Sequence, residues 1–243
     1  MTLSLRLSAV ASMVTPGLRV ADVGCDHGYL AIHLISNNIS PHVIAMDVNR
    51  GPLDRAEKNV GEAGLEDDIE LRLSDGLCKV DPGEVDSVVM AGMGGLLMIN
   101  IIENSSAVCD KLSEMILQPQ SEVAKVRHYL VDNGYRIISE DIVYEDEKFY
   151  PMMKVIHGDM YLEKDVYYRF GKILLHEEHP VLRQYLRYER HMLLNIRDEL
   201  LKADRTEKVE GRLLEIAGDI AAVDEAIAMS DRISPVAIDR ILE

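Results

Sequence analysis

Short apolar runs alternate with helical stretches over roughly the first 135 residues of the chain. The runs predicted as strands are Val20–Val23, Val43–Asp47, Ile69–Leu73, Val85–Ala91 and Met115–Leu117. The stretches predicted as helices are His27–Ser36, Pro52–Ala63, Gly95–Asn104 and Ser121–Asn133. Alternation of this kind is typical of a parallel sheet whose strands are joined by right-handed helical crossovers.

After Gly134 the pattern changes to two extended runs, Tyr135–Tyr144 and Phe149–His157. The acidic segment Glu145–Lys148 joins them, which predicts a β-hairpin. Dehydrogenase Rossmann folds usually continue in parallel, whereas a parallel sheet that ends in an antiparallel hairpin is typical of methyltransferases that use S-adenosylmethionine. We therefore predict the Rossmann-like α/β fold of the class I methyltransferases, with a seven-stranded, mostly parallel sheet.

Beyond Tyr161 the sequence carries no strand signals and instead predicts two long helices, Val181–Lys202 and Thr206–Met229. Their apolar residues recur at alternating steps of four and three, the period of a coiled-coil seam. The seam positions are Leu182, Leu186, Leu193, Ile196 and Leu200 in the first helix, and Val209, Leu213, Ile216, Ile220, Val223 and Ile227 in the second. A three-residue link makes the pair an antiparallel hairpin. The predicted domains are residues 1–160, which bind the cofactor and carry catalysis, and residues 161–243, which form the helical coiled coil. A short amphipathic helix is also predicted over Met1–Val14.

The composition limits the partners and the compartment. The net charge is −16, which argues mildly against a polyanionic partner because phosphate contacts need Lys and Arg. No apolar run approaches the 18 residues that a membrane span requires. The three cysteines are far apart and odd in number, so they support neither a disulfide framework nor a zinc motif. We expect a cytoplasmic protein, and the sequence leaves its oligomeric state open.

The segment Asp22-Val23-Gly24-Cys25-Asp26-His27-Gly28 lies where the first strand turns into the first helix. Gly24 and Gly28 allow a ligand to approach the backbone closely, and the helix that follows offers free amides. A dinucleotide site needs a second glycine where Asp26 stands, and a carboxylate there would repel the pyrophosphate. The cofactor S-adenosylmethionine has no phosphate and carries a positive charge. The segment therefore favours S-adenosylmethionine over NAD, and an ordinary tight turn is the alternative.

Two further acids follow neighbouring strands. Asp47 ends the second strand, about 20 residues after the glycine turn, where a carboxylate accepts hydrogen bonds from both ribose hydroxyls. The alternative is an N-cap for the next helix, a role that Asn49 fills equally well. Asp75, beside Gly76, is placed to accept from the adenine amino group, and a simple turn aspartate is nearly as good an interpretation.

Three glycines follow the fourth strand in the segment Ala91-Gly92-Met93-Gly94-Gly95. So many glycines at the carboxyl edge of a strand indicate a flexible wall beside the transferred methyl group. After the fifth strand, Leu117-Gln118-Pro119-Gln120 offers amide groups for the rim of the site, although a turn is again the alternative.

Together these motifs resemble the TrmK family of bacterial tRNA methyltransferases, and the resemblance covers most of the chain. The matching segments are Leu3–Leu7, Ala21–Leu30, Gly51–Leu53, Gly61–Leu65, Asp75–Leu77, Ala91–Gly95, Leu117–Pro119 and Glu145–Tyr150, followed by the helical hairpin. The chain departs from the family by carrying Cys25 for Ser, Gly28 for Ala, Ala31 for Pro and Gln120 for Asn. None of these changes removes an expected acid or the Met-Gly-Gly loop, but Gln120 leaves the substrate rim least defined.

The resemblance implies methylation of N1 of adenine 22 in tRNA, with S-adenosylmethionine as the donor. It implies that Asp26 lies beside the target base and that Arg6 contacts the substrate. Alkylation of N1 creates a cation that extends onto the exocyclic amine, and a nearby carboxylate stabilises that charge. The alternative for Asp26 is a cap on the first helix. The expected cofactor contacts are Asp22, Gly24, Gly28, Asp47, Asp75, Gly76, Gly92 and Met93, and the expected substrate contacts are Arg6, Tyr29, Gly94, Gly95 and Gln120.

Two features bear on RNA binding. Because N1 lies on the Watson–Crick edge, the adenine must be unpaired or flipped, and Tyr29 and Tyr150 are candidates to stack on it. On the first long helix, Arg183, Arg187 and Arg190 lie along one face and Arg197 follows. A solvated charged face is the commoner explanation, and gripping of the RNA backbone is the hypothesis that the resemblance adds.

Two other functions remain open at this stage. One is a methyltransferase that acts on a small molecule or a protein, for which an acidic surface is no handicap. The other is a catalytically silent module that binds S-adenosylmethionine or RNA and recruits partners through its coiled coil. The intact set of Asp26, Asp47 and Met93-Gly94-Gly95 argues against the silent module.

Overall fold

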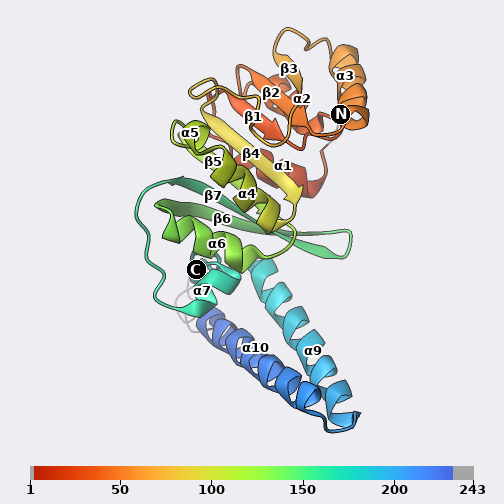
Figure 1. The fold of residues 1–243 in the computed structure, drawn as a ribbon, viewed down its shortest axis with the longest axis vertical. Coiled ribbons are helices and arrows are strands. Elements are labelled where there is room, and N and C mark those ends of the chain that lie inside the picture. Colours follow the sequence, from red (N-terminus) through yellow and green to blue (C-terminus); the bar gives the residue numbers. More distant parts are fainter. Residues whose placement is uncertain (1–2, 232–243) are drawn as a thin grey trace, which may run out of the picture. The chain divides into compact units, whose positions relative to one another are not determined.

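The computed structural model describes residues 3–231. The first two residues of the predicted N-terminal helix and residues 232–243 of the predicted helical domain lie outside the described part. The chain divides into two compact units, Met1–Tyr161 and Leu162–Glu243. All the described strands belong to the first unit (Figure 1).

The first unit is built on a seven-stranded sheet in the order β3-β2-β1-β4-β5-β7-β6. Its strands are β1 (Val20–Val23), β2 (Val43–Asp47), β3 (Ile69–Leu73), β4 (Ser87–Met93), β5 (Glu114–Pro119), β6 (Tyr135–Glu145) and β7 (Lys148–His157). The first five pair in parallel, and β7 joins β5 and β6 in antiparallel fashion. The predicted methyltransferase fold is therefore confirmed. The strand order reverses between the adjacent parallel strands β1 and β4. The carboxyl ends of strands at such a point form the crevice where ligands bind in sheets of this kind.

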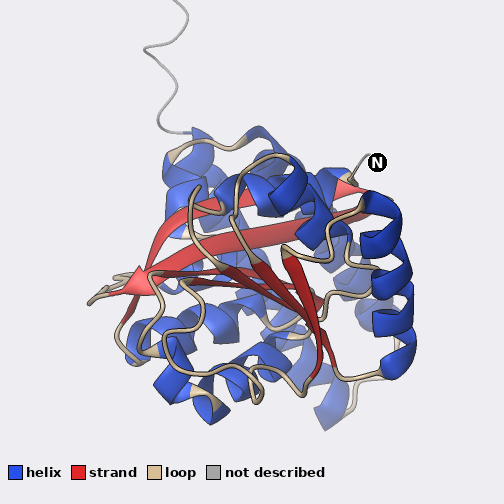
Figure 2. Cartoon of the chain, turned by 90° about the horizontal axis from the view of Figure 1, so that it is seen from above, coloured by secondary structure: helices blue, strands red, loops and turns tan. Residues whose placement is uncertain are grey.

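Helices cover both faces of this sheet (Figure 2). They are α1 (Leu5–Met13), α2 (Tyr29–Ser36), α3 (Arg50–Ala63), α4 (Gly95–Asn104), α5 (Ser106–Cys109) and α6 (Val123–Asp132). Helix α2 packs against α1 and α3, and α4 packs against α5 and α6. Every residue of β1 is buried, because the strand lies at the centre of the sheet beneath these helices. This buried centre gives the loops at its edge a rigid base.

The hairpin of β6 and β7 turns through Asp146 and Glu147, which both have positive φ angles of 47° and 61°. A two-residue loop with this backbone matches the right-handed twist of paired strands. The strands therefore extend one residue further at each side of the turn than predicted, with Glu145 paired to Lys148.

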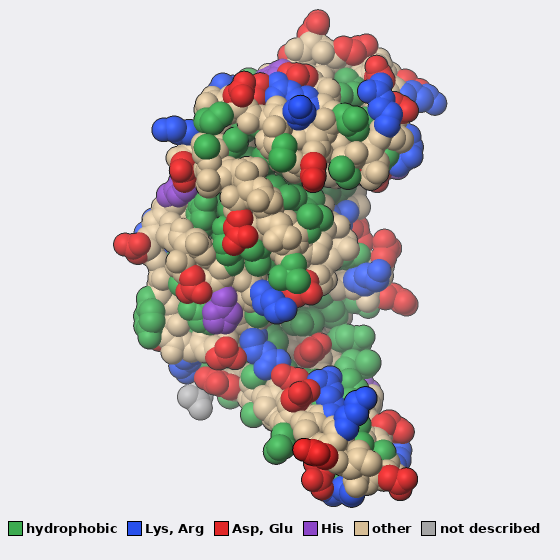
Figure 3. Space-filling view, in the orientation of Figure 1, with side chains coloured by type: hydrophobic (Ala, Val, Ile, Leu, Met, Phe, Trp, Pro, Cys, Tyr) green, Lys and Arg blue, Asp and Glu red, His purple; other side chains and the backbone are tan. Residues whose placement is uncertain are grey.

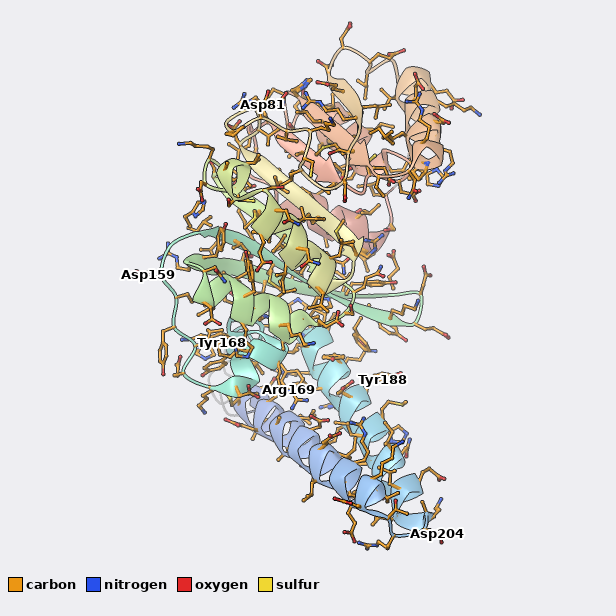
Figure 4. The ribbon with its side chains drawn as sticks, in the orientation of Figure 1. Asp81, Asp159, Tyr168, Arg169, Tyr188 and Asp204 are labelled. Carbon is orange, nitrogen blue, oxygen red and sulfur yellow. The ribbon has the colours of Figure 1, made fainter. Side chains whose placement is uncertain are left out.

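The second unit contains α7 (Asp165–Phe170), α8 (Lys172–His176), α9 (Pro180–Lys202) and α10 (Glu207–Asp231). Helices α9 and α10 lie side by side, joined by the link that carries Asp204 (Figures 1 and 4). Arg190 on α9 pairs with Asp224 on α10, and Arg183 bonds to Ser230. Residue numbers that rise along α9 therefore meet numbers that fall along α10, which makes the two helices antiparallel.

The seam of this hairpin is narrower than predicted. Leu182, Leu186 and Leu193 are buried on α9, and Ile216 and Val223 are buried on α10. The prediction that Ile196 is buried in the seam is wrong, because this residue is 39% exposed. The small residues Ala226 and Ser230 are buried instead near the end of α10, where they allow the two helices to approach closely.

Candidate functional site

The turn between β1 and α2 holds three residues in the left-handed backbone region. Their φ angles are 78° at Gly24, 48° at Asp26 and 72° at Gly28. Glycine adopts this conformation freely, whereas it strains an aspartate, and such strain is often found at functional sites. The amides of Gly24 and Cys25 both donate to the carbonyl of Met46 on β2, at 2.8 Å each. The turn is thus fixed to the sheet while the Asp26 side chain stays 64% exposed.

Helix α3 supports this turn from behind. Arg55 Nη2 donates to Asp26 Oδ1 at 3.2 Å, and Asn59 Nδ2 donates to the carbonyl of His27 at 2.9 Å. These two residues are one helical turn apart and share a face of α3. Between them, Ala56 lies so close that a Cβ at Gly28 would be 3.2 Å from its own Cβ. Asp26 is therefore held by an ion pair and is not the side-chain cap of α2, whose N-cap residue is Gly28.

Asp22 is buried at the end of β1, and its Oδ2 has no hydrogen-bond partner among the described residues. Burial, and then the charge of Asp47, raise the pKa of Asp22 to about 7. Burial, together with the charge of Asp22, also raises the pKa of the Cys25 thiol well above its usual range. An unpaired buried carboxylate of this kind is a strong acceptor for a cationic ligand.

Two cavities meet at Gly24. The first has a volume of about 320 Å³, and the second about 210 Å³. The first is lined by residues of the β1–α2 turn with others from α1 and the β4 and β5 ends, including Arg6, Asp22, Asp26, Tyr29, Gly92 and Gln120. The second is lined by the ends of β2, β3 and β4 with α4, including Asp47, Val48, Asp75, Gly76, Met93 and Ile101. The structure therefore brings the predicted acids, and three of the six predicted glycines, to one edge of the sheet.

The second cavity combines carboxylates with apolar walls. Asp47 Oδ1 accepts from the amide of Asn49 at 2.8 Å, which leaves Oδ2 available to a ligand. Asn49 is the N-cap residue of α3, so the capping alternative for Asp47 is not what the structure has. Gly76 has a φ of 55°, and a Cβ there would lie 2.9 Å from Ile101. Asp75 next to it is exposed at the cavity.

The glycine-rich segment at the end of β4 contributes two residues to the cavities and two to the packing behind them. Gly92 lines the first cavity and Met93 the second. Gly94 and Gly95 line neither cavity. A Cβ at Gly95 would lie 2.6 Å from the carbonyl of Ser121, so this glycine lets α4 pack against the start of α6. Its position indicates a packing role in place of the predicted substrate contact.

The aromatic candidates for stacking differ in their availability. Tyr29 lines the first cavity and stacks on His27, with ring centroids 5.3 Å apart. Tyr150 instead lies beneath the guanidinium of Arg6, 5.5 Å from its ring centroid. Arg6 reaches the cavity from α1, and Gln120 lines it directly after β5; the side chains of both residues lie close to Gly92. Tyr29 is therefore the better placed of the two tyrosines to meet a base.

The sequence reasoning did not identify Arg55, Asn59 and Glu145, which hold the site in place. Arg55 and Asn59 carry no sequence signal, because their partners are about 30 residues away. Gln118 does carry a sequence signal, because it is a polar residue at the end of an apolar strand. The sequence pattern places it at the rim of the site, whereas the structure buries it completely. No group of three or more His, Cys, Asp or Glu side chains within residues 3–231 is arranged to hold a metal ion.

Comparison with known proteins agrees with the fold. A methyltransferase-domain family model matches residues 3–153. The tRNA (adenine(22)-N(1))-methyltransferase of Bacillus subtilis is 30% identical over 234 residues, which cover 93% of this chain and 97% of that protein.

Two solved structures are similar over nearly the same length. A Streptococcus pneumoniae protein assigned as a tRNA (m1A22) methyltransferase, solved with S-adenosyl-L-methionine, is 33% identical with a TM-score of 0.84, covering 93% of this chain and all of that one. The M. capricolum TrmK, solved with the cofactor product S-adenosyl-homocysteine, is 29% identical with a TM-score of 0.81, covering 94% of this chain and 99% of that one.

Proposed function

This chain belongs to the family of tRNA (adenine(22)-N1)-methyltransferases, and we propose that it transfers a methyl group from S-adenosylmethionine to N1 of adenine 22 in tRNA. The observation that carries the proposal is the match over almost the whole of both chains, helical hairpin included, to a curated enzyme with this activity. A tRNA substrate also implies a cytoplasmic protein. Among the described residues, none of the helices is long and apolar enough to cross a membrane.

The two cavities fit S-adenosylmethionine. The unpartnered Oδ2 of Asp22 is an acceptor for the cationic amino group, and Asp47 and Asp75 are acceptors for the ribose and the adenine amine. Gly24 lies at the junction of the two cavities. A Cβ at this position would be 3.1 Å from Met93 Cε and would narrow the junction, so the glycine leaves room for a ligand to extend from one cavity to the other. Gly76, Gly92 and Met93 shape the walls, whereas Gly28 lines neither cavity and packs against Ala56 of α3. When bound, the cofactor supplies an electrophilic methyl group.

We assign Asp26 to the target base. The adenine N1 lone pair is the nucleophile, and its alkylation spreads positive charge onto the exocyclic amine. A carboxylate beside that amine stabilises the charge and accepts the amine proton afterwards. Arg55 and His27 flank the two oxygens of Asp26, at 3.2 Å and 3.6 Å, and keep the carboxylate at the mouth of the cavity.

The remaining contacts align the base. Tyr29 offers a ring for stacking, and Arg6 and Gln120, both close to Gly92, offer hydrogen-bond donors. Alignment of two reactants contributes up to ~7–11 kcal/mol to catalysis in favourable cases, so these residues matter even though they exchange no proton. On this proposal the first unit carries the chemistry and the helical unit contacts the body of the tRNA.

The test is methylation of unmodified tRNA with labelled S-adenosylmethionine, followed by mapping of the modified base. We expect label at N1 of adenine 22 and a loss of at least a hundredfold in turnover for Asp26→Asn, with unchanged cofactor affinity. The matched control is Asp81→Asn, in the loop between β3 and β4 (Figure 4). Full turnover by Asp26→Asn would exclude the role given to this residue.

The same experiment separates the alternatives. Label on other cell components but not on tRNA would indicate a small-molecule or protein substrate. Cofactor binding without transfer to any component would indicate a silent module.

A further inference from the structure

Gln118 is completely buried at the end of β5, where its neighbours Ile116 and Leu117 are apolar. Its Oε1 accepts two hydrogen bonds, one from the amide of Gly92 at 3.1 Å and one from Arg6 Nη1 at 3.0 Å. Its Nε2 donates to the carbonyl of Pro119 at 3.3 Å, which fixes the orientation of the side-chain amide. One oxygen atom therefore joins the end of β4 to the N-terminal helix.

The bond to Gly92 compensates for an irregularity in the sheet. Ala91 pairs with Gln118 and Met93 pairs with Pro119, so Gly92 is an extra residue in β4 and forms a β-bulge. Its φ of 81° is the left-handed conformation that glycine supplies in such bulges. An extra residue loses its partner in the ladder, and a half-buried amide without a partner is unfavourable. Gln118 provides the missing acceptor and so fixes the bulge that directs Gly92 and Met93 toward the two cavities.

The bond to Arg6 fixes a residue from the other end of the sequence, 112 positions away. A carboxylate at the tip of the β6–β7 hairpin holds the start of α1, because Glu145 accepts from the amides of Leu5 at 2.5 Å and Arg6 at 3.2 Å. The Tyr150 ring supports the guanidinium from one side. The bond from Gln118 completes this support and sets the direction in which the guanidinium enters the first cavity.

We propose that Gln118 is a positioning residue that couples the cofactor side of the site to Arg6 on the substrate side. It is buried and so touches neither ligand. It acts through the Gly92 amide and the Arg6 guanidinium, which share its single acceptor oxygen. This role rests on the proposed function, since it presumes that Arg6 meets the tRNA.

Two equilibrium measurements on the full-length protein test the role: the affinity for S-adenosyl-homocysteine, and the affinity for unmodified tRNA at saturating S-adenosyl-homocysteine. Gln118→Met keeps the length of the side chain but removes the acceptor. We expect it to weaken tRNA binding about tenfold and cofactor-product binding a few-fold. Arg6→Ala should weaken tRNA binding to a similar extent and leave the cofactor product unaffected.

The double variant distinguishes positioning from general damage. Because Gln118 acts on tRNA through Arg6, adding Gln118→Met to Arg6→Ala should weaken tRNA binding no further. Gln118→Glu retains an acceptor and should keep tRNA affinity near that of the wild type. If Gln118→Met does not fold, Gln118→Asn replaces it, since the shorter amide cannot reach both donors.

Wild-type tRNA affinity in Gln118→Met, or an effect that adds in full to that of Arg6→Ala, would overturn the inference. A wild-type protein that neither binds nor methylates tRNA would overturn the proposed function instead. In that case the affinity of Gln118→Met for S-adenosyl-homocysteine alone would decide whether Gln118 holds the Gly92 bulge.

Discussion

At the scale of single residues, Asp22 makes the stability of the protein depend on pH. Its pKa is about 7 in the folded protein because of burial and the charge of Asp47, against about 3.9 for an aspartate in an unfolded chain. The folded state therefore binds more protons than the unfolded state between these values, and stability falls as the pH rises from 4 toward 7. The stability that protonated Asp22 provides is fully present below pH 4 and is lost above pH 7.

We expect Asp22→Asn to remove this dependence. The free energy of unfolding of the ligand-free variant should change less between pH 4 and 8 than that of the wild type, as measured by urea denaturation at each pH. A cationic amino group at Asp22 favours the ionised form, so wild-type affinity for S-adenosyl-homocysteine should rise through pH 7, and the variant should bind weakly at every pH. Parallel stability curves for the two proteins would contradict the prediction.

A pair of glycines tests how closely the second cavity is packed. Gly76 and Gly83 both have positive φ, at 55° and 84°, so alanine strains the backbone at either position. A Cβ at Gly76 also meets Ile101 at 2.9 Å, whereas one at Gly83 meets nothing within 4 Å. We expect Gly76→Ala to cost about 1–3 kcal/mol more in unfolding free energy and to weaken S-adenosyl-homocysteine binding. Gly83→Ala should leave that binding unchanged, and equal effects of the two variants on affinity would refute the packing argument.

At the scale of elements, α1 depends on a contact that its own sequence does not contain. Ser4 caps the helix locally by accepting from the amide of Leu7, and Glu145 accepts from two more of its first amides. Glu145→Ala should expose the start of α1 to faster hydrogen exchange and raise the KM for tRNA several-fold, because Arg6 lies in that turn. Glu147→Ala, two residues further along the same hairpin, is the control. Unchanged exchange in residues 5–8 of the Glu145 variant would show that Ser4 suffices.

The bounds of the strands and helices show how much of the fold a single sequence can predict. Strands β1, β2 and β3 and helix α4 have the predicted bounds. Strands β1 and β2 are mainly apolar, and apolar and charged residues alternate in β3, which are the two patterns typical of strands. Strand β4 was predicted to begin at Val85 and end at Ala91, whereas it runs over Ser87–Met93. We assigned Gly92 to a loop, and in the structure it forms a bulge inside the strand. Helices α5, α7 and α8 have four to six residues, too few to show a helical period, and were missed.

The candidate site, too, could be predicted from the sequence only in part. Asp22, Asp47 and Gly24 could be found because the carboxyl ends of parallel strands converge on one edge of the sheet. The contacts of Gln118 with Arg6 and of Arg55 with Asp26 join positions 112 and 29 residues apart, so they follow from the packing of whole elements. Local patterns contain no information on such contacts.

At the scale of the whole molecule, an excess of acidic side chains gives the net charge of −16 and opposes tRNA binding. Acidic and basic groups are interleaved over the α9–α10 hairpin (Figure 3). Three of the four arginines that are candidates for contact with the RNA backbone are already paired: Arg183 with Glu178, Arg190 with Asp224, and Arg197 with Asp198. The pairs of Arg190 and Arg197 are exposed, and exposed pairs contribute little to stability, so a phosphate can displace the acid there at small cost.

The pairing leads to a prediction about tRNA affinity. Asp224→Asn removes the acidic partner of Arg190 and should tighten tRNA binding a few-fold, with a steeper fall of affinity as salt rises, because one more cation is available to phosphate. Asp204→Asn, at the tip of the hairpin (Figure 4), changes the net charge equally without releasing an arginine from a pair. If both variants bind tRNA alike across a salt series, the gain reflects net charge alone, and the arginine face of α9 does not contact the RNA.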